Sequence, residues 1–150
     1  MQIVKAEITP VELTLQHPMQ AAHHASIERV TAIFVRLVTQ QGESAWGCAV
    51  AHPDLNGETP EDVIQVCQDC AAMAPDLHPT NLEYSLGQLE PLTQDSPSAM
   101  CAFDLAFYDL LGLAAGMPLH RVLGGYRHRI LTSVTIGISP VEETVGMARR

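Results

Sequence analysis

Two short pairs of residues carry side chains that commonly bind metal ions. His23 and His24 are adjacent in a polar loop, and Cys67 and Cys70 are three positions apart. Adjacent histidine side chains point apart, and no third ligand is near them in the sequence, which disfavours a metal site in the loop. The cysteines fall within a helical pattern and have no second pair downstream, which disfavours zinc binding and a redox role. We therefore expect no metal site at either pair.

Two aspartates lie five positions apart in a long apolar segment. On a helix, Asp104 and Asp109 would point about 140° apart, so they do not make a catalytic carboxylate pair. A buried carboxylate needs a partner, because an unpaired charge is costly away from water. Arg121, Arg127 and Arg129 follow closely in the sequence. We therefore expect structural ion pairs between these aspartates and arginines.

Basic residues are scarce and scattered along the chain. The formal net charge is −9 at pH 7, and Lys5 is the one lysine. No basic stripe or interleaved aromatic surface is present, so nucleic acid is not an expected partner. Gly124-Gly125 has no Lys-Ser/Thr after it, which indicates a turn rather than a phosphate-binding loop.

The composition is typical of one domain with a good core. The chain has 150 residues, of which 47% are apolar and 17% are charged. Residues 1–9 alternate and lack the basic start and apolar core of a signal peptide. The longest uncharged apolar runs are broken well short of a membrane span. Four cysteines in a chain of this length favour free thiols, so we expect a cytoplasmic protein that does not contact a membrane.

Branched residues and turn signals predict a three-stranded antiparallel sheet near the start of the chain. The expected strands are residues 2–9, 11–17, 30–39 and 44–50. The first two flank Pro10 and could be fused into one strand. Gln41-Gly42 makes the turn between the last two. Residues 18–26 show no periodicity and are expected to form a loop.

Helices follow the sheet in the sequence. They are expected at residues 60–74, from residue 80 to about residue 90, and at 97–115. Thr80 and Glu83 match a capping box for the second helix. The third has Ser96 as N-cap and Pro97 at its first position, and Gly116 ends it. Because this helix is apolar on almost every face, we expect it to be buried on all sides, with something large on its second face.

The last part of the chain has the pattern of one βα unit. Residues 130–138 are typical of a buried parallel strand, and Ser139-Pro140 begins a helix that is still running at Arg150. This is how a barrel starts, so we expect the chain to be the front portion of a longer enzyme. Thr135 lies toward the carboxyl end of the strand, where barrel enzymes place substrate groups, although β propensity alone also explains a threonine there.

The segment from Ala99 to Gly125 resembles a signature of the enolase superfamily, in the branch of mandelate racemase, muconate lactonising enzyme and dipeptide epimerases. In that branch a helix of the form A-x-x-A-x-D-x-A-x-x-D-L-x-G-x-x-x-G-x-P-L-x-x-x-L-G-G closes the N-terminal capping domain. The matching residues are Ala99, Ala102, Asp104, Ala106, Asp109, Leu110, Gly112, Gly116, Pro118, Leu119, Leu123, Gly124 and Gly125. The order of elements also fits, so the resemblance covers essentially the whole chain.

This resemblance implies an α+β fold. An enolase-like N-terminal capping domain, with a three-stranded antiparallel sheet plus a helical bundle, would occupy residues 1–125. The first βα unit of a truncated (β/α) barrel would occupy residues 126–150.

The resemblance also implies a magnesium-dependent enzyme that abstracts a proton α to a carboxylate or carbonyl. Such protons are weakly acidic, so the metal stabilises the enediolate while a lysine removes the proton. The family's lysines and magnesium ligands would lie beyond Arg150, so we expect no catalytic or metal-binding residue in this chain and no activity of residues 1–150 alone.

The most similar members epimerise dipeptides, and a small-molecule substrate and a homo-oligomer are therefore expected. Racemisation of another acid and muconate-type cycloisomerisation remain open within the superfamily. A non-enzymatic α+β binding module is the alternative outside it.

Three candidate substrate-binding residues follow from the resemblance. Thr135 begins a T-[VI]-[SG]-[VI] run that contacts the dipeptide in dipeptide epimerases. His23 and His24 fall in a loop that covers the barrel mouth, and members acting on alanyl-glutamate have an arginine about where His24 stands. A neutral imidazole does not replace the bidentate arginine, so we expect non-acidic dipeptides. The alternative for both histidines is simple solvation.

A fourth candidate lies in residues 51–59, which resemble the family's second mobile loop. Asp54, or His52 beside it, could contact the polar end of a ligand, although most loop carboxylates are only solvated. Cys48, just before this segment, replaces the glutamate of a common W-G-E run. We interpret that replacement as a packing difference rather than a reactive thiol.

Overall fold

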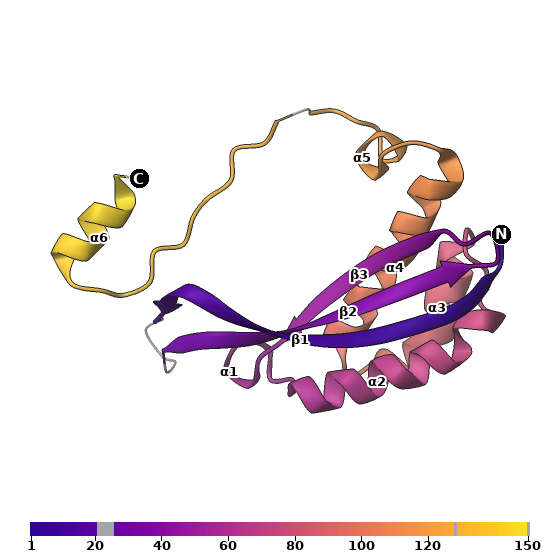
Figure 1. The fold of residues 1–150 in the computed structure, drawn as a ribbon, viewed down its shortest axis with the longest axis horizontal. Coiled ribbons are helices and arrows are strands. Elements are labelled where there is room, and N and C mark those ends of the chain that lie inside the picture. The colour runs from indigo at the N-terminus through magenta and orange to yellow at the C-terminus, as the bar shows by residue number, and fades with distance from the viewer. Residues whose placement is uncertain (21–25, 128, 150) are drawn as a thin grey trace.

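A computed structural model describes residues 1–20, 26–127 and 129–149 of the chain (Figure 1). Strands come first and helices follow. In chain order the elements are β1 (Ile3–Met19), β2 (Ile27–Thr39), β3 (Ser44–Ala51), α1 (Pro53–Asn56), α2 (Pro60–Met73), a short 3-10 helix η1 (Ala74–Asp76), α3 (Leu82–Thr93), α4 (Pro97–Ala115), α5 (Leu119–Val122) and α6 (Val141–Ala148). The predicted α+β arrangement is confirmed.

The strands form one antiparallel sheet in the order β1-β2-β3. β1 is a single strand, so the two short strands predicted around Pro10 are fused. Pro10 is paired with Ile33 in the register between β1 and β2. Because β1 lies at the edge of the sheet, one side of its backbone has no neighbouring strand, and a proline without an N–H is tolerated there.

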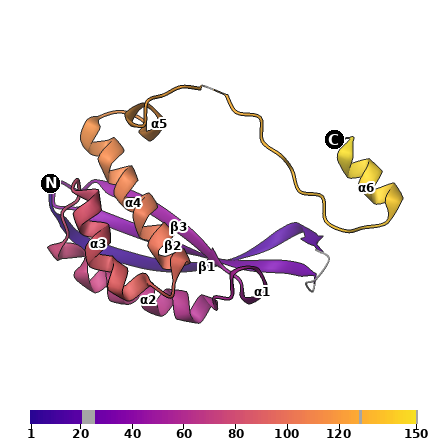
Figure 2. The same ribbon diagram turned by 180° about the vertical axis from the view of Figure 1, so that it is seen from behind.

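Helices α2 and α4 lie against one face of the sheet, and α3 packs on these two helices on the same side of the sheet, as the view from behind also shows (Figure 2). The contact between α4 and β3 is especially close. A Cβ atom at Gly47 of β3 would lie 1.8 Å from the carbonyl oxygen of Ala102 in α4. Glycine is therefore required at this position, because any side chain would push the helix away from the strand.

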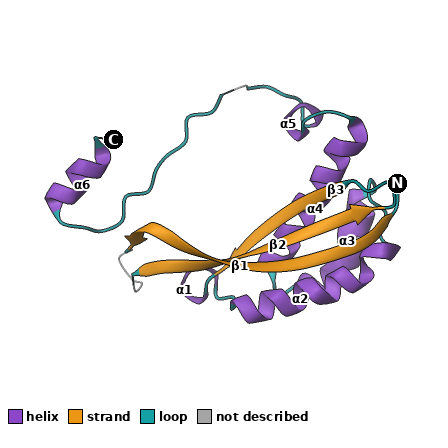
Figure 3. Cartoon of the chain, in the orientation of Figure 1, coloured by secondary structure: helices purple, strands orange, loops and turns teal. Residues whose placement is uncertain are grey.

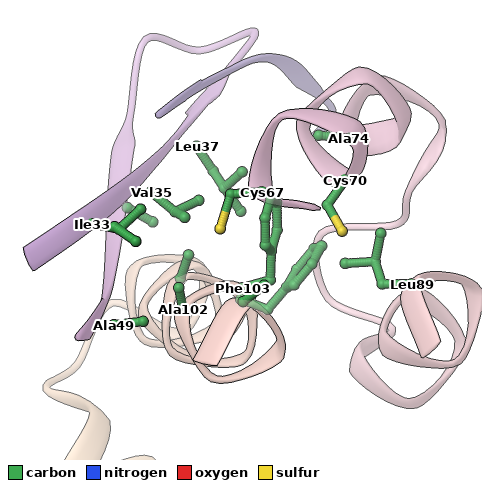
Figure 4. Close-up of a cluster of buried hydrophobic side chains, with 14 of the residues drawn as sticks. Ile33, Val35, Leu37, Ala49, Cys67, Cys70, Ala74, Leu89, Ala102 and Phe103 are labelled. Atoms are coloured by element: carbon green, nitrogen blue, oxygen red, sulfur yellow. The ribbon is translucent and has the colours of Figure 1, made fainter. Parts of the chain in front are cut away.

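The hydrophobic core lies between the sheet and these helices. β2 contributes the alternate residues Ile33, Val35 and Leu37, as the two-residue period of a strand requires. Phe103 and Phe107 of α4 are the largest fully buried side chains. Figure 4 shows the β2 side chains facing Phe103 across the core.

Cys67 and Cys70 of α2 belong to this core and have free thiols. Burial raises the pKa of Cys67 to about 12 and that of Cys70 to about 11. A thiol that stays protonated is a poor nucleophile and a poor metal ligand. Both cysteines therefore act as small apolar side chains, as the helical pattern indicated.

The start of α3 differs from the capping box predicted at Thr80 and Glu83. The helix begins at Leu82 with Asn81 as N-cap, and the Asn81 side chain makes no capping bond. Instead, Nδ1 of His78 accepts hydrogen bonds from the backbone N–H groups of Thr80 (3.4 Å) and Asn81 (3.1 Å). The imidazole satisfies amides at this helix start, so the threonine hydroxyl is not needed there.

The ion pairs predicted for the two aspartates of α4 are not formed within the described residues, where the salt bridges all join β1 to itself or to β2. Asp109 instead accepts a 2.8 Å hydrogen bond from the backbone N–H of Trp46 in β3. β3 is an edge strand, so its amides need partners from outside the sheet. Asp104 is half-buried, and burial together with nearby Glu83 raises its pKa.

One face of α4 is buried and the other is open in the described structure. Phe103 and Leu110 are fully buried, whereas Leu105 and Leu113 are 44% and 41% exposed. The prediction that α4 is buried on all sides is not met here, because the sheet and its neighbouring helices cover one side of it. Among the described helices, α4 is the one long and apolar enough to cross a bilayer, a criterion that core helices of soluble proteins also meet.

Between α5 and α6 the described residues are irregular and mostly exposed (Figure 3). The strand predicted at residues 130–138 is not formed, and Leu131 and Val134 are 102% and 85% exposed. A strand needs a neighbour to receive its backbone hydrogen bonds, and no described strand pairs with this segment. The helix predicted after Ser139-Pro140 is present as α6, but it ends at Ala148 with Arg149 as its C-cap, so the prediction that it is still running at the end of the chain is wrong.

Candidate functional site

The segment after α5 returns to the sheet at the end of β1 (Figure 1). The backbone N–H of Ile138 donates a 2.8 Å hydrogen bond to the carbonyl oxygen of Gln20, which directly follows β1. Two parts of the chain that are far apart in the sequence are thereby joined through backbone atoms. We refer to this contact between Gln20 and residues 137–138 as the hairpin junction.

Gly137 allows the close approach at the hairpin junction. A Cβ atom at this position would lie 3.1 Å from the backbone nitrogen of Gln20 and 3.5 Å from Cα of Met19. The first distance is tighter than ordinary van der Waals contact. A glycine inside a run of branched residues often marks such a close approach of two backbones.

Thr135 lies two residues before Gly137. Its side chain is exposed, and within the described part of the chain its hydroxyl has no hydrogen-bond partner. The predicted strand that would hold it is not formed, as described above. The hairpin junction nevertheless fixes the segment that carries Thr135 beside the end of β1.

His23 and His24 lie outside the described residues. They follow Gln20 in the sequence by three and four positions, so the hairpin junction is where the predicted 18–26 loop begins. The loop prediction agrees with the structure at its start to within two residues, since β1 extends to Met19.

Residues 51–59 form a defined turn around the short helix α1. His52 is its N-cap, and Nδ1 of His52 accepts a 3.3 Å hydrogen bond from the backbone N–H of Asp54. The amide oxygen of Asn56 in turn accepts a 3.0 Å bond from the His52 N–H. The Asp54 carboxylate is exposed and accepts no hydrogen bond from other described residues. No described hydrogen bond brings Asp54 to Thr135, so these two candidates are not shown to share one site.

Glu58, near the end of this turn, has a structural role that its sequence context did not reveal. It is only 7% exposed, and its carboxylate accepts bonds from the Ser96 hydroxyl (2.9 Å), the Ser98 N–H (3.3 Å) and the Ser98 hydroxyl. Asn56 also donates to it at 2.9 Å. A carboxylate at a helix N-terminus satisfies free amides and the positive end of the helix dipole. Ser96 is the N-cap as predicted, but Glu58 does the capping.

Among the described residues, no three His, Cys, Asp or Glu side chains come together in a way that could hold a metal ion. The single lysine, Lys5, lies on β1 and pairs with Glu7 at 2.5 Å. The Lys5 hydrogen bond, together with the charges of Lys5 and Arg36, lowers the pKa of Glu7. The described residues therefore do not fit a magnesium site.

A family model matches the part of the chain that forms this domain. The model of the N-terminal domain of mandelate racemase and muconate lactonizing enzyme matches residues 3–124, from the first residue of β1 to just beyond α5. The chain belongs to this family. Its sheet and helices are the family's N-terminal capping domain, as the A-x-x-A-x-D signature predicted.

Curated relatives and solved structures match almost the whole chain. An L-Lys-D/L-Arg epimerase from Desulforapulum autotrophicum is 33% identical over 99% of this chain and 42% of its own length. A dipeptide epimerase structure from Methylococcus capsulatus, complexed with Mg and L-Arg-D-Lys, is 31% identical with a TM-score of 0.89. One from Enterococcus faecalis, complexed with Mg and L-Leu-L-Tyr, is 26% identical with a TM-score of 0.92. Both structure matches cover 99% of this chain and 42% of the other, so the chain spans about two fifths of the length of these relatives.

The sequence predicted the candidate positions but not the contacts that hold them. The sequence did not single out Gln20, because Gln20 contributes a backbone carbonyl oxygen, which every residue has. The glycine in Thr135-Ile136-Gly137 was a usable signal, since glycine in a branched run suggests a backbone contact. Glu58 could not be paired with Ser96 and Ser98 from the sequence, because about 40 residues separate them.

Proposed function

We propose that this chain is the capping domain and the first barrel segment of a dipeptide epimerase. The observation that carries the proposal is the hairpin junction, together with the family match over residues 3–124. The junction holds the segment with Thr135 against the end of β1, where the loop carrying His23 and His24 begins. In this proposal, the contact would join the end of β1 in the capping domain to the first barrel strand.

The chemistry belongs to residues after Arg150 in this proposal. An epimerase needs an acid and a base on opposite faces of the substrate α-carbon, and Lys5 is engaged with Glu7 on the sheet. Residues 1–150 would bind and enclose the substrate without reacting with it, and alone they would be inactive. Magnesium, which is present in the dipeptide complexes of two structural neighbours, would likewise be held by later residues.

We further propose that the substrate is a non-acidic dipeptide, with cationic side chains favoured. His24 stands about where alanyl-glutamate members place arginine, and an unpaired substrate carboxylate would be costly in a closed site. The 33% identical relative is an L-Lys-D/L-Arg epimerase, and the 31% identical structure holds L-Arg-D-Lys. The chain's net charge of −9 also favours the approach of cationic substrates.

The cytoplasm remains our proposed location, and a homo-oligomer our proposed state. The location is supported by four free cysteines, two of which are buried in the core.

Sequencing the gene past codon 150 tests the proposal directly. We expect the reading frame to continue within about 15 residues into a second branched strand that carries Lys-x-Lys, followed by three spaced acidic residues, because a βα unit is followed by the next strand of a barrel. A stop codon at that point, or a second strand without lysine, would remove the enzyme proposal in this form.

A further inference from the structure

We infer that Gly137 is a positioning residue, which sets the place of Thr135 by letting the backbone at 137–138 lie directly against Gln20. This inference rests on the proposed function, because Thr135 matters only if the segment lines a substrate site.

The contact at Gly137 is made by atoms that cannot swing aside. A Cβ atom there would lie 3.1 Å from the Gln20 nitrogen, 3.4 Å from the Gln20 oxygen and 3.5 Å from Cα of Met19. All three are backbone atoms of Met19 and Gln20, at the end of β1. A flexible side chain could rotate away from a new methyl group, but a backbone must shift as a whole.

The shift would act on the hydrogen bond next to it. Ile138 donates to the same Gln20 carbonyl oxygen at 2.8 Å, and this bond weakens as the two backbones separate. Thr135, two residues earlier, would move with the segment. Even a small displacement of a group that contacts the substrate lowers the binding affinity strongly, because the contact depends on distance and direction.

The cost of a side chain at position 137 is spatial. Gly137 is not among the glycines with positive φ, so alanine can adopt its backbone conformation without strain. Gly146 in α6 offers a matched control, because it also lacks positive φ and a Cβ atom there would meet nothing within 4 Å. Gly137→Ala and Gly146→Ala therefore differ mainly in whether the added methyl group contacts the backbone of Met19 and Gln20.

The experiment compares these two variants in the full-length protein by dipeptide kinetics. We expect Gly137→Ala to raise KM about three- to tenfold with kcat within twofold, and Gly146→Ala to change neither, because a displaced binding group weakens substrate and transition state alike. If Gly137 acts through Thr135, then Gly137→Ala should have little further effect in a Thr135→Ala background. Fully additive effects, or an unchanged KM, would overturn the inference.

Amide hydrogen exchange supplies a readout that does not need activity. Without substrate, the Ile138 amide should exchange several-fold faster in Gly137→Ala than in Gly146→Ala, while peptides from α4 remain unchanged. Equal exchange at Ile138 contradicts the inference even if the protein is no epimerase. If the wild-type protein acts on no dipeptide, the proposed function fails while this measurement still decides the role of Gly137.

A second variant covers the case in which Gly137→Ala does not fold. Gly137→Ser also places a Cβ atom against Gln20, and the T-[VI]-[SG]-[VI] run admits serine at this position, so this variant should fold and raise KM in the same way. An unchanged KM in Gly137→Ser would show that the hairpin junction does not position the binding group.

Discussion

Thr135 offers an exposed hydroxyl on the segment that the hairpin junction holds beside β1. In the full-length enzyme, Thr135→Ala should weaken substrate binding and leave the fold intact. Loss of one contact worth about 1–2 kcal/mol lowers kcat/KM roughly 5- to 30-fold. Steady-state kinetics on the best dipeptide provides the measurement, with Thr132→Ala as the control in the same segment. Kinetics within twofold of wild type would leave β propensity as the sole explanation for this threonine.

Because the thiols of Cys67 and Cys70 are buried, we expect the free energy of unfolding to fall at alkaline pH. Their folded-state pKa values, about 12 and about 11, lie above the ordinary value of 9.0. Below pH 9 the thiols are protonated in both states, so their contribution is fully present. Above it the unfolded thiols ionise first, which favours the unfolded state by up to about 1.4 kcal/mol per pH unit and thiol.

Denaturant unfolding at pH 8, 9.5 and 10.5 measures this effect. The free energy of unfolding should fall with rising pH more steeply in the wild type than in a Cys67→Ala/Cys70→Ala variant, whose lower starting stability does not affect the comparison of slopes. Equal slopes would mean that the two thiols are not shielded as the structure indicates.

Individual residues also show how far the sequence predicted the candidate site. Thr135 and Asp54 were recognised by resemblance, and the structure places both at the surface. The sequence did not reveal their surroundings, because the contacts at Gln20 and Glu58 use backbone atoms or distant hydroxyls. The arginine expected to pair with Asp109 is replaced by a backbone group for a related reason. The Asp109 carboxylate accepts a hydrogen bond from the backbone N–H of Trp46 in the edge strand β3.

At the scale of elements, the packing of α4 on β3 depends on one glycine. Gly47→Ala would bring a methyl group to 1.8 Å from the Ala102 carbonyl oxygen, so the helix must move. We expect the free energy of unfolding to fall by at least about 3 kcal/mol, at the upper end of overpacking effects. Thermal or denaturant unfolding of the variant measures this loss.

Gly87→Ala in α3 is the control for this prediction. A Cβ atom there would meet nothing within 4 Å, and alanine is the better helix former, so stability should rise by roughly 0.5–1 kcal/mol. If both substitutions have the same effect, the close approach of β3 and α4 is not as tight as described.

Most elements could be predicted because their signals are local. The branched run of β2, the Ser96-Pro97 start of α4 and its stop at Gly116 are all read from neighbouring residues, and all three are present. The strand expected at 130–138 depends on a neighbour to pair with, which local sequence does not supply. The start of α3 was missed because His78, three positions before the N-cap, is not a usual capping residue.

At the scale of the whole molecule, apolar side chains are exposed on α4 and on the segment after α5. Leu105 and Leu113 are exposed on α4, and Leu131 and Val134 on the segment after α5. Residues 1–150 expressed alone should therefore self-associate or be poorly soluble, because open apolar area of a few hundred Å² drives association. Light scattering after size exclusion gives the mass, and a clean monomer with a sharp, reversible two-state melt would contradict this expectation.

The most direct measurement is α-proton exchange by the full-length protein in D₂O, with a dipeptide library and deuterium scored by mass. We predict magnesium-dependent deuterium incorporation at one α-carbon, fastest in dipeptides without an acidic second residue. Substituting His24→Arg should then recover some exchange on alanyl-glutamate, because arginine pairs with a carboxylate through two hydrogen bonds. Fastest exchange on alanyl-glutamate by the unmodified protein would contradict the specificity proposed from His24. Absence of exchange on every dipeptide would contradict the proposed function itself.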